Sequence, residues 1–173
     1  DENRKSRYEC VLYNDKGFDY WLNQDFISSD TRTLLQTANV LIVPLLGFRN
    51  TSSPLFHKEI GDFIEYIKEN PPKDIIVEVC IDNDNYKEIS LCSDEIRLGE
   101  IIITSAVFPL AVNLLTEFIK YLIKKKRMNT DKANLEVTIT ISDKKQTKSF
   151  QYAGKAENFS KVFSQIKDLW EKK

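Results

Sequence analysis

The chain has 173 residues, of which 42% are hydrophobic and 29% are charged, and its 25 Lys and Arg nearly balance its 26 Asp and Glu. This size supports a single domain over residues 1–173, or two small packed sub-units over residues 1–72 and 73–173. The net charge of −1 excludes the strongly basic character of nucleic-acid packaging proteins. The five glycines lie too far apart for a phosphate-binding loop, and one histidine cannot supply a multi-histidine zinc site. We therefore expect no metal and no cofactor, and the scarcity of catalytic side chains disfavours an enzyme.

The three cysteines are an odd number, and Cys80 and Cys92 lie in strand-like runs where cysteine behaves as a small buried hydrophobe. This usage favours a reducing, cytoplasmic environment. Nothing in the apolar surroundings lowers a thiol pKa, so we expect no nucleophilic cysteine. The chain begins at Asp1 and its only methionine is Met128, which indicates that an initiator or leader has been removed.

The N-terminal third predicts short elements. Residues 7–12 alternate in polarity as a strand does, and the aromatic-rich residues 17–26 predict a short helix or a loop held against the core. Asp30 is expected to cap a short helix that runs to residue 37. The continuous apolar run 40–46 predicts a strand that is buried on both faces, with Pro44 near its end.

A helix is predicted over residues 54–69, because Ser53 suits the cap position and Pro54 suits the first turn. Prolines at the end of the pattern stop this helix. His57 lies opposite the apolar side and is expected at the surface. That apolar side consists of Phe56, Ile60, Phe63, Ile64 and Ile67.

Two β-hairpins are predicted from alternating residues. In the first, residues 75–81 lead through a turn at 82–85 to a returning strand at 86–92. In the second, residues 135–141 lead through a turn to a returning strand at 147–152. The two hairpins overlay at an offset of 60 residues, which suggests a duplication, although alternating strands are common enough for coincidence.

Each hairpin precedes a long helical pattern, one at 105–127 and one at 156–170. The predicted fold class is α+β, with a mixed or antiparallel sheet, two hairpins each followed by a long helix, and an N-terminal strand-helix-strand-helix segment. The expected core comprises Val40, Ile42, Phe63, Ile67, Val77, Val79, Leu110, Leu114, Val137, Ile139, Phe163 and Ile166.

Residues 101–116 carry no charge and are followed by a basic run at 124–127, as in a membrane span with a positive flank. A span needs about 20 apolar residues. Glu117 and Lys120 interrupt the apolar series and Pro109 lies within it. A buried strand end followed by a core helix is therefore the favoured interpretation, and membrane contact is the less favoured one.

The charges are divided along the chain: residues 1–119 carry 11 basic and 20 acidic side chains, and residues 120–173 carry 14 basic and 6 acidic ones. The densest positive point is the basic run, and we expect it to bind an acidic protein partner or a second copy. A solvated helix end is the simpler alternative. Nucleic acid is disfavoured as a partner, because only Tyr121 offers an aromatic platform nearby. The basic run consists of Lys124, Lys125, Lys126 and Arg127.

The segment from Thr37 to Ile60 resembles the central strand and following helix of Toll/interleukin-1 receptor (TIR) domains. In that family the helix opens with a Trp-Cys-x-x-Glu-Leu motif, whose glutamate is catalytic in the NAD-cleaving members. Leu55 and Phe56 stand at the Trp and Cys positions, and Glu59 falls at the glutamate position. The resemblance implies an NAD-cleaving enzyme that uses Glu59. It covers about 25 residues, and the N-terminal segment is short for the family's second strand.

Residues 101–171 resemble the effector-associated constant component domains of bacterial conflict systems. The resemblance rests on an apolar helix ending in the basic run, the strand 135–141, a short hairpin and a closing helix. Those domains are regarded as non-enzymatic adaptors encoded beside effectors or fused to them. We therefore expect a cytoplasmic adaptor of a bacterial antiviral defence system. The alternatives are a TIR-like enzyme and a protein that binds membrane or nucleic-acid surfaces through the basic run.

Overall fold

The computed structural model describes residues 7–11, 16–91 and 94–171, with side chains for residues 16–91 and 94–166. Within these residues six strands form one mixed sheet in the order β1-β8-β7-β6-β2-β4. Strand β2, which precedes residue 72, pairs with β4 and β6, which follow it, so one sheet joins the two sub-units considered above. The mixed sheet and its helices confirm the predicted α+β class. The strands are β1 Arg7–Val11, β2 Val40–Val43, β4 Val77–Val79, β6 Glu95–Thr104, β7 Asn134–Ser142 and β8 Thr147–Lys155.

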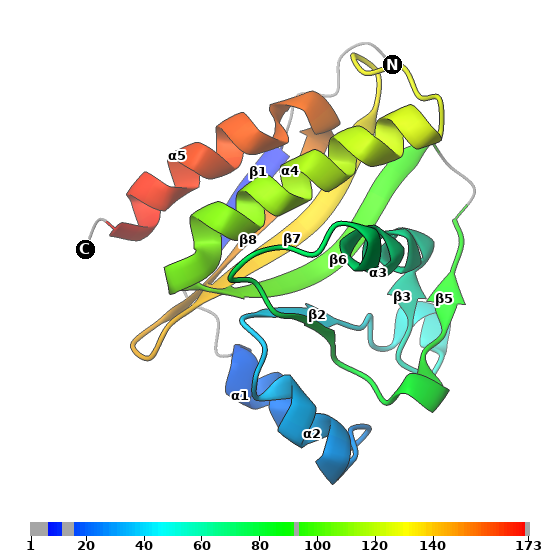
Figure 1. Ribbon diagram of the computed structural model, residues 1–173, viewed down its shortest axis with the longest axis vertical. Helices are drawn as coiled ribbons and strands as arrows, with labels where there is room; N and C mark the ends of the chain where they lie inside the picture. Colours follow the sequence, from blue (N-terminus) through cyan, green and yellow to red (C-terminus); the bar gives the residue numbers. More distant parts are fainter. Residues whose placement is uncertain (1–6, 12–15, 92–93, 172–173) are drawn as a thin grey trace.

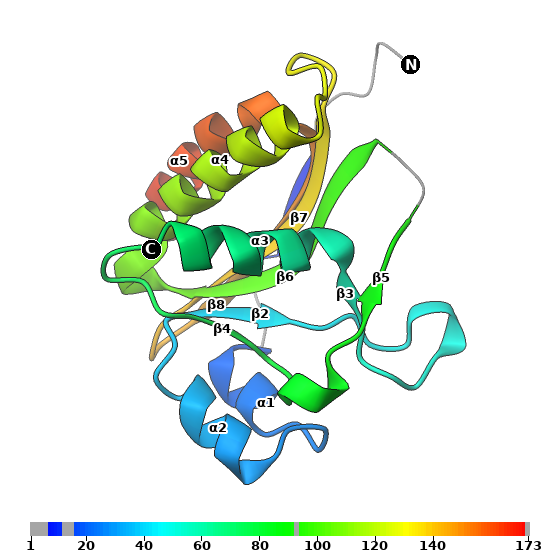
Figure 2. The ribbon, with the colours of Figure 1, turned by 45° about the vertical axis from the view of Figure 1, so that its right-hand side comes forward.

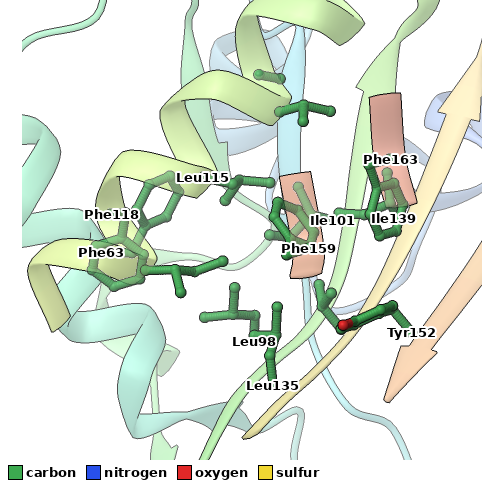
Figure 3. Close-up of a cluster of buried hydrophobic side chains, with 14 of the residues drawn as sticks. Phe63, Leu98, Ile101, Leu115, Phe118, Leu135, Ile139, Tyr152, Phe159 and Phe163 are labelled. Carbon is green, nitrogen blue, oxygen red and sulfur yellow. The ribbon is translucent and has the colours of Figure 1, made fainter. Parts of the chain in front are cut away.

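Helices lie on both faces of this sheet (Figure 1 and Figure 2). Helices α3, α4 and α5 cover one face, where they enclose the larger core, part of which is drawn in Figure 3. Helices α1 and α2 pack on the other face, where Trp21 and Leu35 contact a smaller core that includes Leu41 and Ile102. The helices are α1 Phe18–Leu22, α2 Ser29–Leu35, α3 Lys58–Glu69, α4 Phe108–Lys125 and α5 Phe159–Glu171.

The second predicted hairpin is confirmed as β7 and β8, which pair antiparallel with Ile139 opposite Phe150. Its apolar residues alternate because one face of both strands is buried beneath α4 and α5. Asp143 fixes the turn, since its Oδ1 accepts from the N–H groups of Lys145 and Gln146 at 2.7 and 2.8 Å.

The first predicted hairpin is wrong. Strand β4 runs parallel to β2, and α3 supplies the crossover connection that parallel neighbours need. The residues expected to return, 86–92, contain β5 Glu88–Ile89, which pairs in parallel with β3 Phe56–His57 instead. What recurs along the chain is a strand followed by a 3-10 turn and a long helix, and Phe108 and Phe159, 51 residues apart, begin the two helices.

Strand β6 lies at the centre of the sheet, although the sequence predicted only a strand end near residue 101. A bulge between Arg97 and Gly99 interrupts its register with β7, and Gly99 adopts a φ of 70°. The bulge shifts the alternation by one residue, so that Ile96 and Leu98 face the same core as Ile101. This irregularity hides the strand from a search for a simple two-residue period.

The helix predicted from residue 54 begins at Lys58. Residues 54–57 are extended, because Phe56–His57 pairs with β5, and this tertiary pairing overrides the local Ser-Pro signal. His57 was expected at the surface, but as the cap residue of α3 it is only 8% exposed.

The short N-terminal elements agree more closely with those predicted from the sequence. Residues 17–26 include the helix α1, and all four residues of β2 are buried, as a strand covered on both faces requires. Helix α2 is capped by Ser28 rather than by Asp30, because the Ser28 Oγ accepts from the Thr31 N–H at 3.2 Å.

Helix α4, with the 3-10 turn before it, is long and apolar enough to cross a membrane, and 44% of its most apolar window is buried within the protein. Its buried face runs from Phe108 to Ile123 against the sheet. Leu110 was expected in the core but is 47% exposed. It lies two residues from each of the buried residues Phe108 and Val112, and residues two apart on a helix do not share a face. The other expected core residues are buried or partly buried.

Candidate protein-binding groove

Strand β4 forms one edge of the six-stranded sheet, and no strand in the described part of the chain pairs with its outer side. On its inner side the Cys80 N–H donates to the Ile42 C=O at 2.8 Å. Successive residues of a strand direct their backbone groups to opposite sides, so the N–H groups of Val77 and Val79 point outward. The Val79 C=O accepts from the Ile81 N–H at 2.9 Å. The outer edge therefore presents two N–H donors and the Val77 C=O.

A groove of about 670 Å³ follows this edge. Ile64 and Ile67 of α3 form one wall, and Thr31 and Leu34 of α2 form the other. Figure 2 shows β4 between these two helices. Leu34 is 51% exposed, and Ile76, the residue before the strand, is 47% exposed. An unpaired strand edge thus lies between two partly apolar walls.

Glu78 lines the groove between Val77 and Val79, whose N–H groups point outward. It is half-buried, and burial raises the pKa of its carboxyl group. Within the described residues Glu78 forms no hydrogen bond or ion pair. Glu65 and Lys68 of α3 also line the groove and are exposed at its rim. Glu78 is therefore a carboxylate without a cationic partner in the described structure.

Tyr86 also lines the groove. Its ring stacks on Phe56 with the centroids 5.1 Å apart, and its hydroxyl donates to the Glu88 Oε1 at 2.8 Å. Burial and the Glu88 carboxylate raise the pKa of this hydroxyl, so it stays protonated and remains a donor. Gly61 of α3 leaves room for the carboxylate, because a Cβ at that position would overlap Glu88.

The structure brings together two sites that the sequence placed apart. The Lys126 Nζ lies 3.9 Å from the Glu59 Oε1 and 3.9 Å from the Asp62 Oδ2, and the Lys125 Nζ lies 4.0 Å from the Asp62 Oδ1. The proposed catalytic residue is thus paired with the proposed partner-binding run. Lys124 and the rest of the basic run remain exposed. Two of its four cations already face carboxylates of α3.

His57 is enclosed where α3 begins, and its Cδ2 lies against Gly99 in the bulge of β6. Burial lowers its pKa most, Glu59 raises the pKa, Arg97 lowers it and Glu136 raises it. The net shift of the pKa is downward, which favours the neutral imidazole. We interpret His57 as a structural residue of the β3–α3 junction.

The expectation that no cysteine is an activated nucleophile can be tested at one position, Cys80. Cys80 is a free, fully buried thiol, and burial raises its pKa to about 12, so it is not an activated nucleophile. Among the described residues no group of three or more His, Cys, Asp or Glu side chains could hold a metal ion.

Sequence reasoning missed the groove, because it assigned β4 a partner in a hairpin that does not form. One signal was present: a charged residue in the middle of a three-residue strand is typical of a sheet edge.

Comparison of the chain with protein-family models, curated proteins and solved structures found no match.

Proposed function

We propose that this protein is a non-enzymatic adaptor that binds an extended segment of a partner protein along the outer edge of β4. The observation that carries the proposal is the pair of outward N–H groups, at Val77 and Val79, on the floor of a groove with apolar walls. Strand addition to an exposed sheet edge is a recurrent mode of peptide recognition, in which main-chain hydrogen bonds supply affinity and side-chain pockets supply specificity.

The two walls suit an added strand because strand side chains alternate in direction. Residues of the partner that point toward α3 would contact Ile64 and Ile67, and those that point toward α2 would contact Leu34. Binding would also cover the exposed part of Leu34, at roughly 25 cal/mol for each Å² of apolar surface removed from water.

The resemblance of residues 101–171 to effector-associated constant components supports the same class of function. On this basis the protein acts in the bacterial cytoplasm, within a conflict or antiviral defence system, and its partner is an effector. The basic run 124–127 is a less favoured binding surface, since Lys125 and Lys126 already face carboxylates of α3.

A TIR-like enzyme is the competing proposal, and it requires Glu59 to reach NAD. The Glu59 side chain is only 14% exposed and is paired with Lys126. Incubation with NAD should therefore release no nicotinamide, and release that is lost in Glu59→Gln would favour the enzyme.

The adaptor proposal is tested with short random peptides displayed on phage and selected on the whole protein. Selected peptides should lose binding to Val79→Pro, which removes an outward N–H without touching a bond to β2. Leu34→Ser should weaken binding as well, while Leu110→Ser, a matched change at a residue 47% exposed on α4, should not. Binding that survives both groove variants would contradict the proposal.

A further inference from the structure

From the charge of Glu78 in the groove we infer the chemistry of the partner: its strand carries Lys or Arg opposite this residue, with apolar residues at positions that face the walls. This inference rests on the proposed function, because it concerns the same edge.

Glu78 is the middle residue of the three-residue strand β4. A strand added to β4 places one residue directly opposite it, with Cβ atoms about 4.5–5.5 Å apart. Because Glu78 forms no ion pair within the described structure, covering it with an apolar strand would bury its charge without compensation. A Lys or Arg at the opposite position supplies that compensation, and its apolar stem can lie along the groove wall.

The same carboxylate argues against a second copy as the occupant. Two β4 strands that pair antiparallel about Glu78 would use the outward groups of Val77 and Val79 in both copies. That register sets Glu78 directly opposite its own symmetry mate, and like charges in opposed positions destabilise a strand pair. A charged residue at an edge also discourages edge-to-edge association in general.

The wider charge distribution points in the same direction. Residues 1–119, which contain β4 and both groove walls, carry 11 basic and 20 acidic side chains. This field attracts a basic segment and raises its association rate. The local carboxylate and the surrounding field therefore favour the same partner chemistry.

The test uses short random peptides on phage, selected in parallel on wild type, Glu78→Lys and Glu69→Lys. Glu69 is exposed at the end of α3 and does not line the groove, so Glu69→Lys matches the change in net charge. Wild type and Glu69→Lys should enrich alternating apolar residues around a Lys or Arg, whereas Glu78→Lys should enrich Asp or Glu at that position. A lysine peptide should bind Glu78→Lys roughly 3- to 10-fold more weakly than wild type, a range set by cross-strand charge pairs.

Different results would overturn the proposed function and the inferred partner chemistry. Peptides that need the β4 edge, as judged by Val79→Pro, but show no preference opposite Glu78 would overturn the inference and leave the adaptor function standing. Peptides that never depend on the edge would overturn both. Dimerisation in sedimentation experiments that Val79→Pro abolishes would show a second copy as the occupant and would also overturn the inference.

Discussion

The close approach of Gly61 and Glu88 beside Tyr86 leads to a quantitative prediction. Gly61 lies inside α3, where alanine would normally stabilise the helix by about 0.8–1.0 kcal/mol. A Cβ at Gly61 would overlap the Glu88 carboxylate, which accepts from the Tyr86 hydroxyl. Glu88 is exposed and can move aside, but it then loses this hydrogen bond.

The magnitudes follow from these two opposing effects. Losing the hydrogen bond costs about 0.5–1.5 kcal/mol, which offsets the helix-propensity gain, so Gly61→Ala alone should change the free energy of unfolding by less than about 1 kcal/mol. In a Glu88→Ala background the overlap and the hydrogen bond are both gone. Gly61→Ala should then stabilise the protein by about 1 kcal/mol. The coupling between the two positions is therefore also about 1 kcal/mol.

Urea unfolding of the four proteins in this cycle measures the coupling, provided that the denaturant dependence of unfolding is unchanged. Tyr86→Phe is the control, since it removes the hydroxyl but keeps the Glu88 carboxylate. Gly61→Ala should stabilise the Tyr86→Phe protein too, because Glu88 then moves without losing a bond. Additive effects within about 0.5 kcal/mol in the cycle would refute the reasoning.

Three further predictions concern the core, the histidine and the basic run. Phe163→Ala should lower the free energy of unfolding by about 3–5 kcal/mol through the cavity that it leaves. The exposed Leu110 is the control, since Leu110→Ala should cost less than about 1 kcal/mol, and an equally small loss for Phe163→Ala would contradict the core position of Phe163. His57 is the only histidine, so its NMR titration needs no assignment and should give a pKa below 6.5. Its contribution to stability should be complete above pH 6.5 and be lost as the pH falls through the folded-state pKa; a pKa at or above 6.5 would refute the assigned burial. Lys126→Glu should destabilise the protein by up to about 1 kcal/mol at low salt and by less at high salt, because the new carboxylate would face Glu59 and Asp62 of α3. An equal loss of stability in Lys124→Glu would show that the pairing of Lys126 contributes nothing specific.

The parts of the fold that the sequence predicted are those set by local pattern. The β7–β8 hairpin joins neighbouring segments through a turn that Asp143 stabilises, so alternation and turn chemistry were sufficient. Strand β2 was evident because a short, continuous apolar run has few other solutions. The helices α4 and α5 were predicted because their apolar residues recur at helical spacing, which is also a local pattern.

The parts that the sequence did not predict depend on contacts between distant segments. The pairing of Phe56–His57 with Glu88–Ile89 delays the start of α3 and buries His57, and no local signal records it. The candidate groove exists only because β4 pairs with β2 instead of turning back, which leaves its other side open. The sequence showed Glu78 as a charged residue inside a strand, but its place in a groove at the sheet edge follows only from the pairing of β4 with β2.

Amide hydrogen exchange of the protein, with and without a selected peptide, tests the adaptor proposal most directly. If the peptide adds a strand to β4, the exchange of the Val77 and Val79 N–H groups should slow strongly on binding, because each then donates to the peptide backbone. The N–H of Cys80, which already donates to Ile42, should change far less. Peptide binding that leaves both valine amides unprotected, or that protects only the end of α4 around the basic run, would contradict strand addition at β4.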